Sequence, residues 1–348
     1  MRGSGLDAKA RKLLSFTDNR QDASLQAGHF NDFVEVGLLR GGLHKAVVAA
    51  GPEGLRHENL TQKVFDALAL PMTAYASNPD AKFQAKADTD KAFRDVLGYR
   101  LYRDLKRGWR VTSPNLEQCG LLEIRYLSLD ELCQATEEWK GTHAALEAAS
   151  PATRRWIAKV LLDYLRRELA IKVNYLDRTF QEQIQQKSSQ RLIDPWAIDE
   201  NEARALEYAS VAFPRPSSGQ GETGDYVFLS SRGGFGQFLG RRATFPDLAR
   251  PLKLDDRQRI IRELLERLAL AGIVEAVVPK RSADDVPGYQ IVADALAWVA
   301  ADGTRAFHDP IRVPRESAEK GRTNPFFVDF YRNTAAKLHG LAAREHTA

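Results

Sequence analysis

The residues of this chain best suited to chemistry could bind phosphate at the start of a helix. In residues 12–34 a short apolar run leads through a polar turn into a helical pattern of apolar residues. The turn offers N-cap side chains, and the N–H groups of a helix N-terminus attract anions. Arg20 is therefore the first candidate phosphate-binding side chain, and Thr17, Asp18 and Asn19 supply the turn before it. Asp18 would oppose an anion unless Arg20 or a capped N–H engages its carboxylate. The simpler interpretation is an ordinary strand–turn–helix, which occurs in every α/β protein.

A second basic group lies at the end of a helix predicted over residues 88–109. Arg103, Arg107 and Arg110 surround Trp109, and Asp104 is the one carboxylate nearby. Guanidinium groups beside an aromatic ring suit a phosphate backbone and a stacked base. The alternative is an ordinary solvated helix face with Trp109 docked in the core, and runs of charge favour that simpler interpretation.

A third basic group belongs to a predicted winged helix over residues 225–302. The pattern is a helix at 234–242, a helix at 257–271 ended by Gly272, a strand at 273–278, a polar loop and a return strand at 289–292. The candidate nucleic-acid-binding residues are Ser230, Ser231, Arg232, Arg241, Arg242, Lys280 and Arg281. They would bind phosphates without reading sequence. Eleven basic residues meet ten acidic ones over 226–302, so a structural brace between lobes is an equal alternative.

Motifs for catalysis are absent from the sequence. There is no G-x-x-x-x-G-K-[ST] loop to hold phosphates and no acidic motif at a buried strand to hold Mg²⁺. The two cysteines and seven histidines show no zinc-binding spacing, and no Ser-His-Asp arrangement stands out. We therefore expect this chain alone to be no enzyme and to hold no metal or cofactor.

Composition indicates an ordinary globular protein. Its 348 residues, 43% of them hydrophobic and 28% charged, are enough for two or three domains with a sizeable core. No run of 18 apolar residues and no signal-peptide pattern occurs, which predicts a cytoplasmic protein without membrane contact. A net charge of +4 is only a mild bias towards polyanions, so the position of the basic residues matters more.

The elements that must position these residues are mainly helical. After residues 12–34, Gly41 and Gly42 break the pattern, and 43–50 predicts a second helical piece. Further helices are predicted at 60–70, at 88–109 and, as the longest, at 152–188, with a strand or another helix within 116–132. Residues 213–224 are rich in Pro, Gly and Ser and predict a linker with a domain boundary.

Residues 12–34 resemble the opening of the second RecA-like lobe of DEAD/DEAH-box (superfamily 2) helicases, most closely large bacterial helicases of the Lhr and MrfA kind. Residues 324–348, NPFFVDFYRNTAAKLHGLAAREHTA, are similar to the helix and following strand of that lobe, and residues 108–126, GWRVTSPNLEQCGLLEIRY, to the insertion in the same group. The resemblance implies a fragment in which roughly 290 residues interrupt a motor lobe, far longer than an ordinary loop.

From this resemblance we expect a mainly α fold with small β elements, in which a helical insertion domain and a winged helix are flanked by partial RecA-like α/β pieces. The expected divisions are 1–50 for the start of the lobe, 51–224 for the helical insertion, 225–305 for the winged helix and 306–348 for the connector and return.

The resemblance also implies the function of an accessory region of an ATP-dependent DNA helicase, in which Thr17, Asn19 and Arg20 would contact the backbone of the nucleic-acid strand. Its partners would be nucleic acid, bound without sequence preference, and the missing motor lobes, while ATP and Mg²⁺ would belong to the complete parent. The alternatives are a protein-interaction scaffold that braces the motor lobes or another subunit, and a sequence-specific winged helix of the transcription-factor type.

Overall fold

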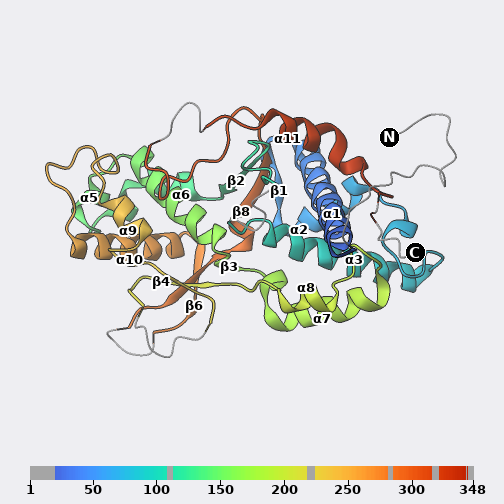
Figure 1. The fold of residues 1–348 in the computed structure, drawn as a ribbon. Coiled ribbons are helices and arrows are strands. Elements are labelled where there is room, and N and C mark those ends of the chain that lie inside the picture. Colours follow the sequence, from blue (N-terminus) through green and yellow to red (C-terminus); the bar gives the residue numbers. More distant parts are fainter. Residues whose placement is uncertain are drawn as a thin grey trace.

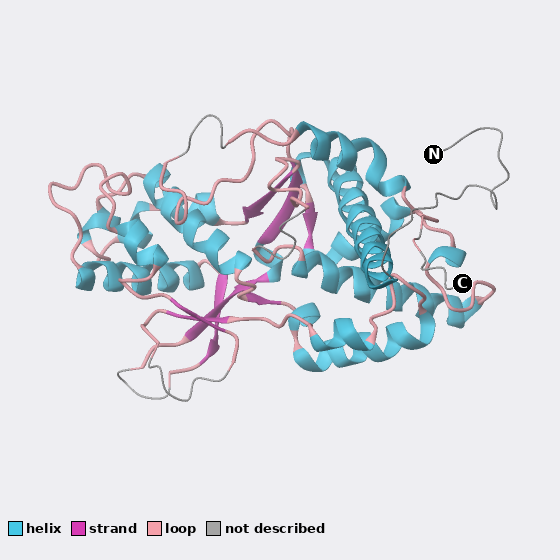
Figure 2. Cartoon of the chain, viewed as in Figure 1, coloured by secondary structure: helices cyan, strands magenta, loops and turns pink. Residues whose placement is uncertain are grey.

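The computed structural model describes residues 20–107, 113–217, 224–280, 285–315, 321–341 and 343. The protein is mostly helical and carries two small sheets, as Figures 1 and 2 show. The helices are α1 Arg20–Ala50, α2 His57–Leu68, α3 Phe83–Arg103, α4 Leu129–Gln134, α5 Ala144–Glu147, α6 Pro151–Arg167, α7 Arg178–Arg191, α8 Glu200–Arg204, α9 Gly234–Leu239, α10 Leu254–Leu270 and α11 Pro325–Asp329. The strands are β1 Leu55–Arg56, β2 Leu122–Tyr126, β3 Ile171–Lys172, β4 Val211–Phe213, β5 Tyr226–Phe228, β6 Val274–Val278, β7 Gly288–Val292 and β8 Leu296–Ala300. The predicted mainly α fold with small β elements is confirmed, whereas its helical insertion domain, winged helix and RecA-like pieces stay predictions.

Helix α1 runs unbroken through Gly41 and Gly42, so the predicted break before residues 43–50 is wrong. A Cβ on Gly41 would lie 2.5 Å from the backbone N of Ala336, and one on Gly42 would lie 2.7 Å from the Leu68 side chain. The two glycines therefore let α2 and the C-terminal segment pack directly against the α1 backbone. A local pattern could not reveal these distant neighbours.

The first sheet unites distant parts of the chain. Its strand order is β1-β8-β2, and both outer strands pair antiparallel with β8. Trp298, at 1% exposed, lies opposite Leu55 on one side and Ile124 on the other. Helices α1 and α2 pack against each other, and α1 also contacts β8 (Figure 1). The undecided segment within 116–132 thus contains an outer strand of this sheet, β2, followed by α4.

The helix predicted over residues 152–188 is wrong, because two helices with a strand between them occupy this stretch. Helix α6 ends at Arg167, and Leu169 takes a left-handed backbone conformation with φ 57°. Ile171 and Lys172 then form β3, which pairs parallel with β7, before Asp177 caps α7 by accepting from the Phe180 N–H. The apolar residues continue through the break because both helices bury one face.

The second sheet is mixed and contains β3, β4, β5, β6 and β7. The predicted helices at 234–242 and 257–271 and the two strands at 273–278 and 289–292 correspond to α9, α10, β6 and β7. Helix α10 packs on α9 and β6, as a winged helix would require. Strand β7 also pairs with β3 and β4, and β4 pairs with β5. The sheet therefore crosses the predicted domain boundary between residues 224 and 225.

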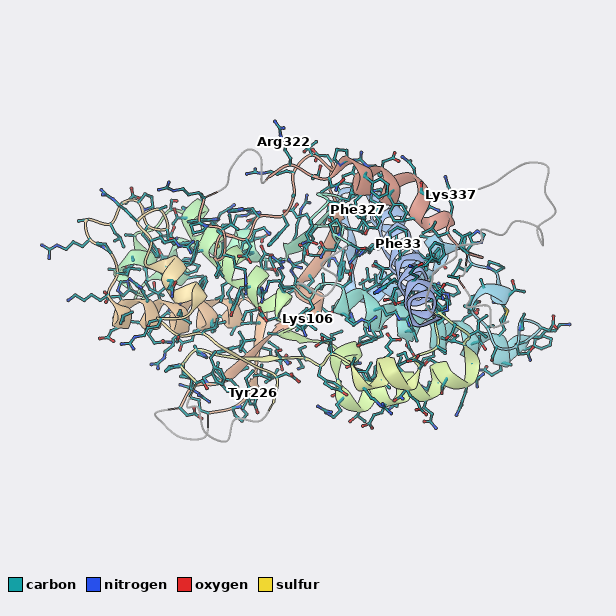
Figure 3. The ribbon with its side chains drawn as sticks, viewed as in Figure 1. Phe33, Lys106, Tyr226, Arg322, Phe327 and Lys337 are labelled. Atoms are coloured by element: carbon teal, nitrogen blue, oxygen red, sulfur yellow. The ribbon has the colours of Figure 1, made fainter. Side chains whose placement is uncertain are left out.

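The C-terminal segment returns to α1. Helix α11 continues as a π-helical turn, Phe330–Thr334, and a short 3₁₀ turn, Ala335–Lys337, both of which pack along α1. Figure 3 labels Phe33 of α1 and Phe327 of α11 in the region where these two helices lie. Among the described residues, no helix is both long and apolar enough to cross a membrane.

Candidate nucleic-acid interface

The first predicted site lies almost wholly outside the described residues. Thr17 and Asn19 precede the described part of the chain, and Arg20 is described only as the first helical residue of α1. Trp109, Arg110 and Arg281 also lie outside the described residues. The prediction that these residues bind nucleic acid is therefore untouched by the geometry that follows.

The expected cationic face at the end of α3 does not form at Arg100 and Arg103, which are 1% and 5% exposed. Glu202 of α8 accepts hydrogen bonds from both: Arg100 Nη2 lies 2.9 Å from its Oε2 and Arg103 Nη1 2.7 Å from its Oε1. Arg100 Nη1 also lies 3.1 Å from Glu35 Oε1. Arg103 is therefore part of a buried ion network between α1, α3 and α8, which corrects the solvated-face interpretation as well.

Burial and charge act in opposite directions on the two carboxylates of this network. Burial raises the pKa of Glu202, but the Arg100 and Arg103 guanidinium groups outweigh it, and the pKa lies below its ordinary value. Burial also raises the pKa of Glu35, and there it prevails over the attraction of Arg100. Glu202 is thus the anion that holds the two arginines together.

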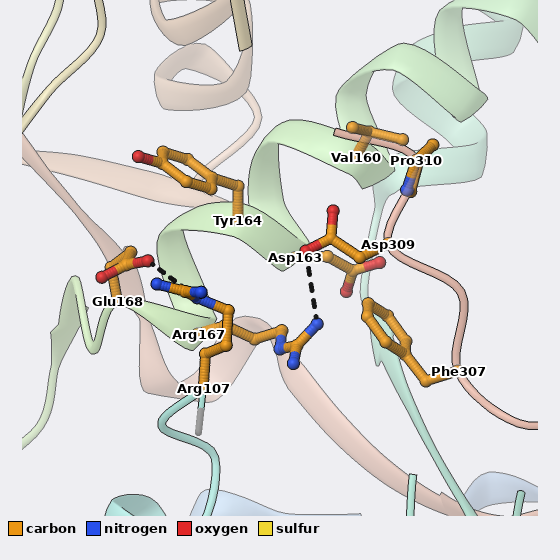
Figure 4. A pocket seen from close by; sticks show the side chains of 9 residues that line it. All are labelled: Arg107, Val160, Asp163, Tyr164, Arg167, Glu168, Phe307, Asp309 and Pro310. Carbon is orange, nitrogen blue, oxygen red and sulfur yellow. Dashed lines mark hydrogen bonds and ion pairs between the residues drawn. The ribbon is translucent and has the colours of Figure 1, made fainter. Parts of the chain in front are cut away.

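Arg107 lines a small pocket at the junction of α6 and the connector that follows β8 (Figure 4). Its Nε lies 3.3 Å from Glu168 Oε1. Arg167 lies 4.6 Å from the centre of the Phe307 ring and 3.6 Å from Asp309 Oδ2. The pocket has room for little more than one water molecule, and its two guanidinium groups already face the carboxylates of Glu168 and Asp309. Because Asp163 also lines the pocket, three carboxylates stand against two guanidinium groups there, which is unlike a phosphate site.

Helix α9 places its basic residues differently. Arg241 is partly buried and donates to the carbonyl oxygens of Pro310 and Ile311, the latter at 2.9 Å, so it holds the connector against α9. Arg232 and Arg242, at opposite ends of α9, are exposed, and Lys280 is exposed after β6. These three are the candidate cations that the structure leaves on the surface.

The two candidate serines have structural roles before α9. Ser230 Oγ accepts a hydrogen bond of 3.0 Å from the Gly233 N–H, and the Ser231 N–H donates to Gln258 Oε1 at 2.9 Å. Both bonds fix the loop that enters α9.

An aromatic surface that sequence reasoning missed borders the predicted linker. Phe213, Tyr226 and Phe228 lie on β4 and β5, with Arg215 beside them. The signal was available in the spacing of Tyr226 and Phe228, since residues two apart on a strand share one face. It went unused because residues 213–224 were interpreted as a linker.

The comparisons with known proteins return no likeness. No family model matches this chain, and neither the curated proteins nor the solved structures contain a match. Within the part of the chain that the structure describes, no three His, Cys, Asp or Glu side chains gather where they could hold a metal ion. The function must therefore be argued from this chain's own residues.

Proposed function

We propose that this chain is an accessory region of an ATP-dependent DNA helicase, which binds the nucleic-acid backbone and guides or separates strands. The observation that carries the proposal is the meeting of the two ends of the described chain. Asn31 Nδ2 donates to the Ala343 carbonyl oxygen at 3.1 Å, and the Ala343 N–H donates back to Asn31 Oδ1 at 2.8 Å. Residues that are 312 apart thus pair as neighbours, as expected of an insertion within a lobe.

Helix α1 and the C-terminal segment pack closely against each other where the two ends meet. A Cβ on Gly37 would lie 2.9 Å from Leu338 Cδ1, and the rings of Phe33 and Phe330 are 5.0 Å apart. Arg40 of α1 donates to Tyr331 Oη at 2.9 Å and also binds Asp104 with an Nη2–Oδ1 distance of 2.6 Å. The pair formed by α1 and the C-terminal segment is therefore tied to the helical insertion through a buried arginine.

The nucleic-acid part of the proposal depends on the exposed cations Arg232, Arg242 and Lys280. Such residues neutralise phosphates and release counterions, so binding should weaken steeply with salt. They carry no base-specific geometry, which supports binding without sequence preference.

Fluorescence polarisation with single-stranded and forked DNA over a salt series tests this. We expect log K to fall linearly with log salt, and the triple variant Arg232→Glu, Arg242→Glu, Lys280→Glu to flatten the slope by about 2 on a single strand. Lys45→Glu, Lys63→Glu, Lys82→Glu changes three exposed lysines elsewhere and is the matched control, expected to keep more of the slope. Absence of binding at about 10 μM, or binding indifferent to salt, would contradict the proposal.

Parentage has a separate test in the neighbouring coding sequence. A phosphate-binding loop encoded upstream and an Arg-rich ATPase motif encoded downstream would support a helicase parent. If a continuous reading frame around this chain encodes neither motif, the helicase part of the proposal fails and only nucleic-acid binding remains.

A protein-interaction scaffold is the second candidate, and the exposed aromatic rings near the meeting of the two ends favour it. Phe326 is 64% exposed and Phe30 42% exposed, while Phe326 stacks on the buried Phe330 with centroids 6.1 Å apart. Under this reading the triple charge reversal leaves DNA affinity unchanged, whereas Phe326→Ser weakens attachment to the motor lobes.

A further inference from the structure

We propose that Phe213, Tyr226 and Phe228, together with Arg215, form a platform on which one unpaired base of a single-stranded nucleic acid stacks. We call these four residues the aromatic platform. The inference rests on the proposed nucleic-acid binding and assigns it a site that the basic residues alone do not define.

The strand register gathers the rings. Strands β4 and β5 pair parallel, with Phe213 opposite Phe228 and Val211 opposite Tyr226, so all four side chains share one face of the sheet. The Phe213 centroid lies 5.5 Å from that of Tyr226 and 6.2 Å from that of Phe228, while Tyr226 and Phe228 are 6.1 Å apart. The three rings thus form one aromatic cluster, in which Phe213 and Phe228 are stacked and Tyr226 meets both of them edge to face.

Two glycines permit this arrangement. Gly224 has φ +144°, and a Cβ there would lie 2.9 Å from the Tyr226 ring. A Cβ on Gly288 of the neighbouring strand β7 would lie 2.5 Å from Val211 Cγ1 and 2.9 Å from the Phe213 ring. Because Tyr226 and Phe213 lie directly over glycine backbone, these two rings have little freedom to collapse away from their positions.

The exposed fractions of the rings indicate which class of ligand the aromatic platform can bind. Phe213 is only 8% exposed and packs edge to face against Tyr226, which is 39% exposed. Figure 3 shows Tyr226 at the lower margin of the molecule. One accessible ring matches the face of a nucleobase and is far smaller than the interface of a folded protein partner. The base must be unpaired, since a base inside a duplex has no free face.

Charge supplies the second part of the recognition. The Arg215 guanidinium lies 5.1 Å from the centroids of both Phe213 and Phe228, and its Nη1 donates to the Pro216 carbonyl oxygen at 3.0 Å. Arg262 of α10 reaches the same loop, with its Nε 3.5 Å from the Pro214 carbonyl oxygen. Cations beside a stacking surface suit a base with its attached phosphate, whereas a purely apolar peptide would gain nothing from them.

Oligonucleotides with a single 2-aminopurine among thymines test the platform, because the fluorescence of this base is quenched when it stacks on an aromatic ring. We expect the full chain to quench it, and Tyr226→Ala to lose the quenching and about ten-fold of the single-strand affinity. Tyr226→Phe keeps the ring and should behave as the unaltered chain. Phe83→Ala, at a ring 91% exposed on α3, is the matched control and should change neither measurement.

The outcomes separate this inference from the proposed function. If the chain binds single-stranded DNA with a steep salt dependence but Tyr226→Ala leaves affinity and quenching unchanged, the platform is refuted and the proposed function stands. If the unaltered chain binds no nucleic acid, the proposed function fails. Equal losses for Tyr226→Ala on single-stranded and duplex DNA would also overturn the platform, because stacking requires a free base face.

Discussion

Two regions of this chain differ in whether their arginines are buried or exposed. At the end of α3, Arg100 and Arg103 are buried and share Glu202, whereas at α9, Arg232 and Arg242 stand in solvent. The sequence around 100–110 is the richer in positive charge, yet these two arginines stay inside and contribute to packing. The comparison teaches that a cationic surface depends on where the carboxylates of other elements lie.

The largest effect should follow from removing Arg100. Arg100→Ala leaves the buried Glu35 and the half-buried Glu202 without their shared cation, and breaking a buried pair typically destabilises a protein by about 3–5 kcal/mol. Arg232→Ala at the exposed site should change the free energy of unfolding by less than about 0.5 kcal/mol. Urea unfolding of both variants measures the difference. Equal effects would abolish the distinction between the two regions.

The buried network should also respond to pH. The pKa of Glu202 lies below its usual 4.5, so its ionised form stabilises the fold fully above that pH. This contribution is lost as pH falls below 4.5 through the lower pKa of the folded state. Glu202→Gln should therefore be less stable than the unaltered chain at pH 7, with a gap that narrows steadily below pH 4.5.

Thermal unfolding from pH 7 to about pH 3 measures this gap. Asp130→Asn is the control: its carboxylate is exposed, and its partner Arg155 is also on the surface. The difference in stability between Glu202→Gln and the unaltered chain should change with pH more than the corresponding difference for Asp130→Asn. A Glu202 gap that is constant across the range would show that this carboxylate does not hold the arginines.

How much could be foreseen from sequence differs between the same two regions. Helix α10 and the β6–β7 strands were predictable because an apolar stripe, Gly272 and β-branched residues are local signals. The burial of Arg103 was not predictable, because its partner Glu202 lies 99 residues further along the chain. The division of 152–188 into α6, β3 and α7 likewise depends on the pairing of Ile171 with Ile291.

The same contrast between local signals and distant partners applies to the candidate site residues. The exposure of Arg232 and Arg242 was predictable, because residues beside a predictable helix need no distant partner to stay on the surface. Arg241 has a similar sequence context but donates to Pro310 and Ile311, which only the folded connector brings near. The aromatic platform needed the parallel pairing of β4 with β5 across a stretch that was interpreted as a linker.

A smaller effect should distinguish two glycines of α1. Gly41→Ala would place a Cβ 2.5 Å from the Ala336 backbone N, and such overpacking typically destabilises by about 1–3 kcal/mol. Gly28 has nothing within 4 Å of its Cβ position, so Gly28→Ala should stabilise the helix by about 0.5–1 kcal/mol. Opposite signs in chemical denaturation would support close packing between α1 and the C-terminal segment, and equal signs would contradict it.

The smallest effect should come from Arg107, which lies between the two regions in burial. Its side chain is 33% exposed, and its partner Glu168 is 27% exposed. Water screens such a pair, so Arg107→Ala should change the free energy of unfolding by no more than about 1 kcal/mol. A loss as large as that of Arg100→Ala in the same urea experiment would place Arg107 in the buried network. A small loss in stability together with weaker DNA binding would instead assign Arg107 to the surface that Arg232 and Arg242 represent, because only a solvent-accessible cation can exchange its carboxylate for a phosphate.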